Sequence, residues 1–237
     1  MKLIRWIYLL FLLSGFSQAS DIPIEPPPGH VLQTLKSRFR SAEVDYPPER
    51  IQLIALKESR RLELWAWEAP QWRHVVDYPV FAASGHNGPK LEEGDRQVPE
   101  GFYRIEALNP NSHFHLSLKL NYPNAYDWKN ALDEGRTTPG SNIFIHGSAW
   151  SKGCLAIGNR NVDEVFALVS EVGIDNAYVL IAPYDFRTRE LGVEANQPAW
   201  VKELYAYLNV RMAQFPLSAK HKTIELSRSV PPHGGGG

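Results

Sequence analysis

Residues 143–159 read IFIHGSAWSKGCLAIGN, an apolar alternating run, a loop of small residues and a second apolar run. The alternation predicts a strand over 142–146 that ends at His146. The glycines of the loop allow the chain to turn back, so that Cys154 begins the next run. We therefore expect a thiol and an imidazole to meet at the end of one strand.

That pair suits nucleophilic catalysis. A free thiol is only a few per cent thiolate near neutral pH, so a reactive cysteine needs a base or a positive charge beside it. Histidine is the usual base, because its ordinary pKa lies close to the working pH. The backbone N–H groups of Gly153 and Cys154 are candidate donors to an oxyanion. The alternative is that His146 only ends a strand and Cys154 is an inert core thiol.

The start of the chain favours the catalytic interpretation. Residues 1–19 combine Lys2 and Arg5, a short apolar run and the small-residue sequence Ser17-Gln18-Ala19, a pattern typical of a secretory signal peptide. We expect cleavage near Ala19 and a periplasmic mature protein. Cys154 is the one cysteine of the chain, so no internal disulfide can form, and an exported free thiol without a function would be a liability.

The remaining sequence predicts a mainly β domain with helices. Residues 20–48 are expected to form a Pro-rich spacer with one short helix within 30–39, and residues 218–237, which end in four glycines, a disordered tail. The catalytic domain is expected over 49–184 and a C-terminal helical extension over 185–217. Runs rich in β-branched and aromatic residues predict strands at 51–57, 61–67, 72–83, 101–106, 114–118, 142–146 and 177–181.

Two further helices are expected. Asn161 and Glu164 resemble a capping box, an apolar stripe follows them, and Gly173 ends the pattern. The second helix is expected over 198–214, with an apolar side made of Trp200, Leu204, Tyr207, Leu208 and Met212.

Residues 121–141 show no regular pattern and are expected to form a binding loop. The residues of this loop suited to clasping a polar ligand are Tyr122, Tyr126, Trp128 and Arg136.

Other classes of function are disfavoured. A net charge of −1 offers no basic footprint for nucleic acid, and no run after the leader is long enough to span a membrane. His113 and His115 are two residues apart without a third ligand in sequence, so we expect a solvated or hydrogen-bonded pair and no metal site. Gly94-Asp95 is expected to be a turn, and Lys90, Glu92 and Glu93 a solvated face. No cofactor is expected.

Taken in order, several motifs resemble one family. HGSAWSKGC (146–154) is similar to the active-site signature of the YkuD-type L,D-transpeptidases, and the likeness is closest to their YafK-like murein branch. The motifs that carry it are GDRQVPEGFYRIEALNPNS (94–112), FHLSL (114–118), NYPNAYD (121–127), IFIHGS (143–148) and SKGCLAI (151–157). The resemblance implies a β-rich, sandwich-like catalytic domain with a helix packed on it after the cysteine.

The resemblance also implies a reaction. Cys154 would attack the carbonyl at the L-centre of diaminopimelate in a peptidoglycan stem peptide, with His146 as base and Gly153 as oxyanion donor. Residues that would shape the pocket or bind substrate are Gly147, Ser151, Lys152, Tyr122, Asn124 and Arg136. Two positions depart from many members of the family, which carry His and Arg where this chain has Lys152 and Ala156. Lys152 or Arg136 would then bind the carboxylate of the acyl donor.

Three functions stay open. The thioester could pass to an amine, which makes a cross-link, or to water, which makes the protein an L,D-endopeptidase or carboxypeptidase. Cleavage could trim stems or release a wall-attached lipoprotein. A wall-binding protein with an inactive site is the third interpretation. A papain-like protease is disfavoured, because the expected sequence around its cysteine and its distant downstream histidine are missing.

Overall fold

The computed structural model describes residues 25–217. The predicted signal peptide and the predicted tail therefore lie outside the described residues. Within them, no helix is both long and apolar enough to cross a bilayer.

The described strands form one curled nine-stranded sheet in the order β3-β2-β1-β9-β5-β6-β7-β8-β4. Its strands are β1 (Ile51–Leu56), β2 (Arg61–Glu68), β3 (Gln71–Pro79), β4 (Ala82–Ala83), β5 (Gly101–Ser112), β6 (His115–Leu120), β7 (Phe144–His146), β8 (Leu155–Ala156) and β9 (Ala177–Ala182). The prediction of a mainly β fold with packed helices is confirmed. The sandwich-like shape comes from one sheet, since the first part of β5 pairs with β9 and the rest pairs with β6.

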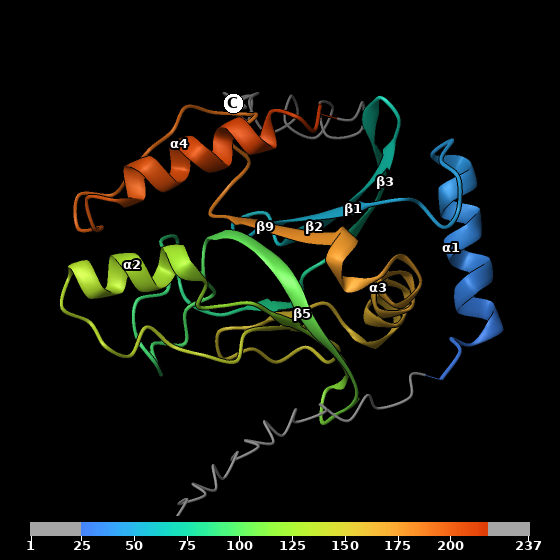
Figure 1. Ribbon diagram of the computed structural model, residues 1–237, viewed down its shortest axis with the longest axis horizontal. Helices are drawn as coiled ribbons and strands as arrows, with labels where there is room; N and C mark the ends of the chain where they lie inside the picture. Colours follow the sequence, from blue (N-terminus) through green and yellow to red (C-terminus); the bar gives the residue numbers. More distant parts are fainter. Residues whose placement is uncertain (1–24, 218–237) are drawn as a thin grey trace, which may run out of the picture.

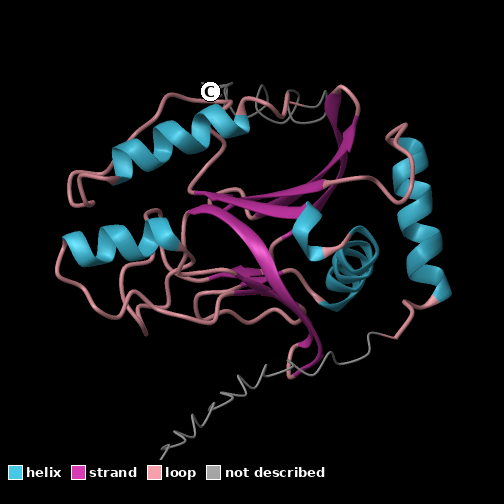
Figure 2. Ribbon diagram, viewed as in Figure 1, coloured by secondary structure: helices cyan, strands magenta, loops and turns pink. Residues whose placement is uncertain are grey.

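Helices cover both faces of this sheet (Figures 1 and 2). They are α1 (Gly29–Ser41), α2 (Ala125–Asp133), α3 (Asn159–Val172) and α4 (Val201–Met212), and a short 3-10 helix covers Ile174–Asn176. α3 lies in the concave side of the curl and shares the larger apolar core with α1 and strands of both halves. α4 packs on the opposite face, over Ile54, Leu56 and Leu180. The sheet is thus buried on both faces where α3 and α4 pack on it.

Helix α1 belongs to the core, which differs from the predicted spacer. Its Val31, Leu35 and Phe39 repeat every four residues and are buried against the rest of the domain. Arg38 also donates from Nε to Glu164 of α3 at 2.7 Å. The prolines before it are compatible with an extended lead, but the apolar stripe requires a surface to bury it.

The capping box was predicted at the wrong helix. α3 starts at Asn159, two residues before the predicted cap, and Gly158 precedes it without a side-chain cap. Glu164 is only 2% exposed and pairs with Arg38 instead of capping the helix. The helix does end at Gly173, as predicted, where φ is +86°.

A complete capping box instead begins α2. The side chain of Asn124 accepts from Tyr126 N–H and Asp127 N–H, and Asp127 accepts from the N–H of Asn124. The segment 121–141 therefore contains a helix where the sequence predicted only a loop.

The last predicted helix is present as α4. Leu204, Leu208 and Met212 are buried as expected, but Tyr207 is 45% exposed and does not belong to the apolar side.

Candidate active site

The pairing of β7 with β8 brings the predicted nucleophile and base to one place. The two strands are parallel, with Ile145 opposite Leu155 and His146 opposite Ala156. The residue before Leu155, Cys154, then aligns with Phe144, whose backbone N–H donates to Sγ. Because side chains alternate along a strand, Cys154 and His146 point to the same face as diagonal neighbours.

The imidazole of His146 is held in a fixed orientation. Its Nδ1 lies 2.5 Å from the carbonyl oxygen of Gly147, which can only accept, so Nδ1 carries the proton. The neutral ring therefore presents an unprotonated Nε2. The Phe114 ring lies over the imidazole with 4.7 Å between the ring centroids and an interplanar angle of 30°. The sequence alone does not identify the Gly147 carbonyl as the group that orients His146.

The electrostatics favour a neutral pair at rest. Burial lowers the pKa of His146 below its ordinary value, although the hydrogen bond to Gly147 opposes this. Burial also raises the pKa of the Cys154 thiol, against smaller lowering effects of Phe144 N–H and the charge of Lys90. The thiol donates weakly to the carbonyl of Asn142, with 3.8 Å between Sγ and oxygen. At neutral pH the site therefore holds a thiol beside an unprotonated base.

The turn after His146 is anchored to the start of α3. Ser148 has a φ of +65°, and its N–H donates to Asn159 Oδ1 at 2.7 Å. A Cβ on Gly147 would lie 2.5 Å from the Phe114 carbonyl and 2.6 Å from Asn159 Oδ1. Gly147 is thus needed for close packing, and this packing fixes the carbonyl that orients His146.

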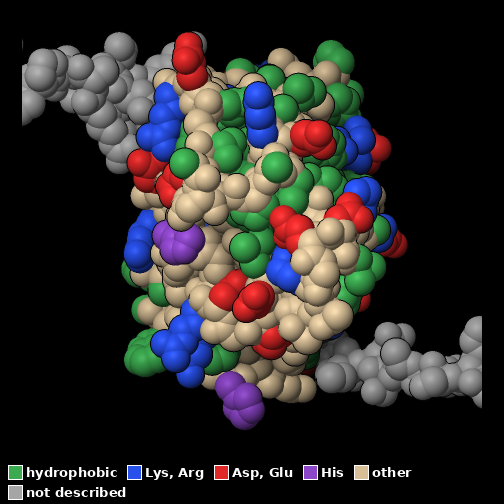
Figure 3. Space-filling view, turned by 90° about the vertical axis from the view of Figure 1, so that its left-hand side faces the viewer, with side chains coloured by type: hydrophobic (Ala, Val, Ile, Leu, Met, Phe, Trp, Pro, Cys, Tyr) green, Lys and Arg blue, Asp and Glu red, His purple; other side chains and the backbone are tan. Residues whose placement is uncertain are grey.

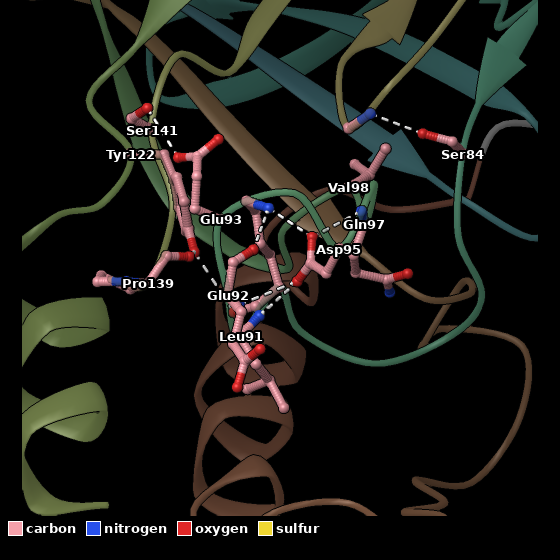
Figure 4. A network of polar contacts seen from close by, with 12 residues as sticks. Ser84, Leu91, Glu92, Glu93, Asp95, Gln97, Val98, Tyr122, Pro139 and Ser141 are labelled. Carbon is pink, nitrogen blue, oxygen red and sulfur yellow. Dashed lines mark hydrogen bonds and ion pairs between the residues drawn. The ribbon is translucent and has the colours of Figure 1, made fainter. Parts of the chain in front are cut away.

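Two serines brace the loop that carries Cys154. Ser151 Oγ donates to the Cys154 carbonyl at 2.6 Å and lies 3.1 Å from Ser84 Oγ. Gly153, with φ at +109°, donates its N–H to Ser84 Oγ at 2.6 Å. Figure 4 labels Ser84 and marks this hydrogen bond by a dashed line. The N–H predicted as an oxyanion donor is therefore engaged in this state, and that role requires Ser84 to turn away.

A polar network organises the loop at 90–97 (Figure 4). The Asp95 carboxylate accepts from Lys90 Nζ and from the backbone N–H groups of Leu91, Glu92 and Gln97. Burial alone would raise the pKa of Asp95, but these hydrogen bonds hold it below its ordinary value. Lys90 is 7% exposed, which corrects the predicted solvated face at that residue.

Three residues predicted to bind substrate serve the framework in this structure. Tyr122 is 4% exposed and donates its hydroxyl to the Pro139 carbonyl at 2.7 Å. Asn124 caps α2 and donates from Nδ2 to the Phe102 carbonyl. Arg136 pairs with Glu134 at 2.5 Å and donates to the Leu91 carbonyl. Their polar groups are already used, so substrate contacts would have to compete with these bonds.

Other predicted residues remain accessible. Lys152 is exposed next to the cysteine loop, and Tyr126 and Trp128 are 38% and 40% exposed. His115 bonds to Asp163 at 2.6 Å, as expected for a hydrogen-bonded histidine. Among the described residues, no group of three or more metal-ligating side chains could hold an ion.

The sequence did not point to Ser84, Asn159 or Phe114. Ser84 and Phe114 touch the site from distant parts of the chain, while Asn159 lies just after the second apolar run. Ser84 lies 69 positions from the glycine that it binds. The one available signal was Gly158-Asn159 directly after the second apolar run, since asparagine often bonds to nearby backbone at turns.

Comparisons with known proteins agree with these features. The family model of YkuD, an L,D-transpeptidase catalytic domain, matches residues 50–179. YafK of Escherichia coli (strain K12), a provisionally named L,D-transpeptidase, is 29% identical over 182 residues, or 76% of this chain and 71% of that protein.

Two solved structures are also similar. The helical cell shape determining protein Pgp2 of Campylobacter jejuni is 25% identical, with a TM-score of 0.47. Bd1075 of Bdellovibrio bacteriovorus is 22% identical, with a TM-score of 0.42. Each match covers 57% of this chain and 48% of the solved chain, so this chain spans about half of their length.

Proposed function

Because the chain belongs to the YkuD family of L,D-transpeptidase catalytic domains, we propose that it is a cysteine-dependent L,D-transpeptidase of peptidoglycan stem peptides. The observation that carries the proposal is the geometry of one strand pair. Cys154 and His146 share a face of the β7–β8 ladder, and Nδ1 of the imidazole is tied to the Gly147 carbonyl. Export to the periplasm through residues 1–19 is part of this proposal.

The chemistry has two halves. Cys154 Sγ attacks the carbonyl at the L-centre of diaminopimelate, while His146 Nε2 takes the thiol proton. The C–S bond forms, the C–N bond to D-alanine breaks, and the imidazolium returns its proton to the leaving amine. An acceptor amine then attacks the thioester, gives its proton to His146, and releases the sulfur.

The pKa directions support this order of proton transfer. A His146 with a pKa below its ordinary value is unprotonated at neutral pH and can accept a proton. A Cys154 with a raised pKa keeps its proton until the substrate arrives. The proton therefore moves during the attack, and the carbonyl environment must stabilise the charge that develops.

Hydrolysis is the competing outcome of the same thioester. If water reaches it before an amine, the protein acts as an L,D-endopeptidase or carboxypeptidase, which would trim stems or release a wall-attached lipoprotein. Ala156, where many members have arginine, is fully buried in the strand, while Lys152 is exposed. Lys152 is therefore the side chain we propose for the donor carboxylate.

The test uses muropeptides and a panel of variants. Wild-type protein, Cys154→Ala and His146→Ala are incubated with disaccharide tetrapeptides, and the products are identified by mass. Wild type should give cross-linked dimers, and trimmed stems would instead assign hydrolysis. The cysteine variant should give neither product, while Arg40→Ala, at an exposed position of α1, should match wild type. Equal products from wild type and Cys154→Ala would reject the enzyme and leave a wall-binding protein.

Thiol acylation can be tested without a natural substrate. A carbapenem should add its mass to wild type at Cys154 and leave Cys154→Ala unmodified. His146→Ala should react more slowly, because it lacks the base. An unchanged intact mass of the wild type after long incubation would contradict the proposal.

A further inference from the structure

A second concave surface lies away from the cysteine. It has a volume of about 380 Å³ and is lined by side chains of β1, β2, β3, β5 and β9 together with the C-terminal end of α4. These strands form the half of the sheet opposite to β7 and β8 in the strand order. We call it the α4 groove and define it by Arg50, Gln52, Trp67, Trp72, Phe102 and Arg211. Arg211 comes from the last turn of α4. Helix α4 itself packs over the neighbouring part of the same sheet face, as its course over β1 and β9 in Figure 1 shows.

Aromatic rings form the walls of the α4 groove. Phe102 stacks on Tyr178 with 5.8 Å between the ring centroids and 19° between the planes. Trp67 and Trp72 meet edge to face at 5.4 Å. All four side chains are only half-buried, so part of each ring surface stays accessible to a ligand, although Arg50, Arg211 and Phe215 also contact these rings. The faces of aromatic rings carry partial negative charge and stack well against the C–H faces of sugar rings.

The charge of the α4 groove has one sign. Its lining includes two arginines and no aspartate or glutamate. Arg50 lies over Trp67 at 4.7 Å, and Arg211 lies over Phe102 at 4.5 Å. By contrast, the face of the molecule in Figure 3 mixes acidic and basic side chains. The two guanidinium groups are thus held among aromatic rings where they would attract an anion.

In the described part of the chain, the ion pair found at these guanidinium groups is a long one, between Arg50 and an exposed carboxylate. The carboxylate of Glu49 lies 3.9 Å from Arg50 Nε, and this Nε is buried without a hydrogen-bond partner. Arg211 donates from Nε to the Tyr207 hydroxyl at 3.0 Å, a neutral group. Donors therefore remain for a carboxylate ligand, and bidentate binding of a carboxylate is the geometry that guanidinium groups favour.

Amide groups complete the α4 groove. Gln52 is 3% exposed and donates from Nε2 to the Leu53 carbonyl at 2.9 Å, which leaves its side-chain oxygen as an acceptor for a hydroxyl or amide N–H. Gln214 lines the same surface. The aromatic rings, the amide groups and the two arginines together fit a saccharide that carries carboxylates.

We propose that the α4 groove binds a carboxylate-bearing saccharide, namely the glycan strand of peptidoglycan at muramic acid residues whose lactyl carboxylate carries no stem peptide. This inference rests on the proposed function, which supplies the wall as the substrate. Since the groove and Cys154 lie in opposite halves of the sheet, one strand could be held while a stem peptide reaches the thiol. The groove would then act as an anchor and take no part in the bond-making steps.

The test measures binding of glycan strands from which an amidase has removed the stem peptides. Titration calorimetry uses the full Cys154→Ala chain as the background, so that no turnover occurs. Adding Arg211→Gln should weaken binding about tenfold, as expected for loss of a charge-assisted contact, and Trp72→Ala should weaken it at least as much. Arg40→Ala on α1 is the matched control and should bind like the background protein. Circular dichroism confirms that each variant is folded.

Other outcomes decide against the α4 groove. Unchanged glycan affinity in folded Arg211→Gln and Trp72→Ala would overturn the inference, as would tighter binding of free stem tetrapeptide than of glycan at this surface. Turnover of soluble disaccharide tetrapeptides separates this result from the proposed function. Arg211→Gln in a chain with Cys154 intact should keep that turnover, and a loss would reject an anchoring role. If the wild-type protein forms no product from these tetrapeptides, the proposed enzymatic function is rejected, while glycan binding by the α4 groove can still be measured.

Discussion

Glu164 of α3 links this helix to α1 and β3, and its removal should lower the free energy of unfolding. It accepts from Arg38 of α1 at 2.7 Å and from the Tyr78 hydroxyl of β3 at 2.9 Å. Glu164→Ala leaves the Tyr78 hydroxyl, at 1% exposure, without its acceptor, which costs about 1–3 kcal/mol. It also removes a charge-assisted bond worth about 1.5–3 kcal/mol. Because the Arg38 side chain is 30% exposed, water recovers part of this loss. We expect a net loss of about 3 kcal/mol.

The matched control is the neighbouring Asp163→Ala. Asp163 bonds to His115, and the two side chains are 26% and 43% exposed, so their exposed pair is worth about 1 kcal/mol at most. Both substitutions place alanine in α3, and the gain in helix propensity is a few tenths of a kcal/mol larger for Asp163→Ala, in the same direction as the expected difference. Urea unfolding followed by circular dichroism should show a clearly lower midpoint for Glu164→Ala than for Asp163→Ala. Equal midpoints would refute the reasoning that α1 is an integral part of the domain.

Three further predictions concern the site and its surroundings. Gly147→Ala should lower the acylation rate of the thiol by more than tenfold. The new Cβ would press on the Phe114 carbonyl and shift the backbone carbonyl that accepts from His146. An acylation rate within twofold of wild type would contradict this. Since burial lowers the pKa of His146, the acidic limb of the kcat/KM profile should fall below pH 6.5, and a half-maximal point above pH 7 would contradict this base. Burial raises the pKa of Asp127 to about 6, so the folded state favours the protonated carboxyl. The stability that this protonation contributes is complete below the unfolded pKa of 3.8 and is lost as the pH rises through 6. Asp127→Asn should therefore gain stability relative to wild type between pH 4 and pH 7 in urea titrations, and parallel curves would show that this carboxyl does not titrate as stated.

The strands were predictable where the pattern is local. The runs at 51–57 and 61–67 are dense in β-branched and aromatic residues, and both form strands. β5 continues to Ser112, beyond the predicted end at 106, because its second part pairs with β6 despite Pro110. Pro110 lies within a register irregularity between Asn109 and Ser112, a position where a strand tolerates proline, and a single sequence does not display that irregularity.

Helix α2 was missed for a different reason. Its exposed side includes Tyr126 and Trp128, while the polar Asn130 is buried. This pattern reverses the usual distribution of apolar and polar residues, so periodicity could not find the helix. The available signal for α2 is the capping box of Asn124 and Asp127, which has the same spacing as the Asn161–Glu164 pair that does not cap a helix.

The candidate site was predictable to the extent that it lies within one stretch. His146 and Cys154 are eight positions apart, and their residue types suggest their chemistry directly. The partners of Ser84 and Asn159 are backbone groups of that stretch, contacted across a fold that the sequence does not reveal. Tyr122 and Arg136 show the opposite problem, because residue types suited to a ligand serve equally well as buried hydrogen-bonding groups.

The short connection between β7 and β8 limits how this chain can vary. Parallel neighbours usually need a crossover of a dozen or more residues, yet here residues 147–154 join them. Adding or deleting one residue just before Leu155 would turn the sulfur to the other side of the sheet, since side chains alternate with a period of two. Substitutions at exposed positions such as Trp150 leave that parity intact. Homologues and engineered versions should therefore tolerate changes of composition in this connection far better than changes of its length.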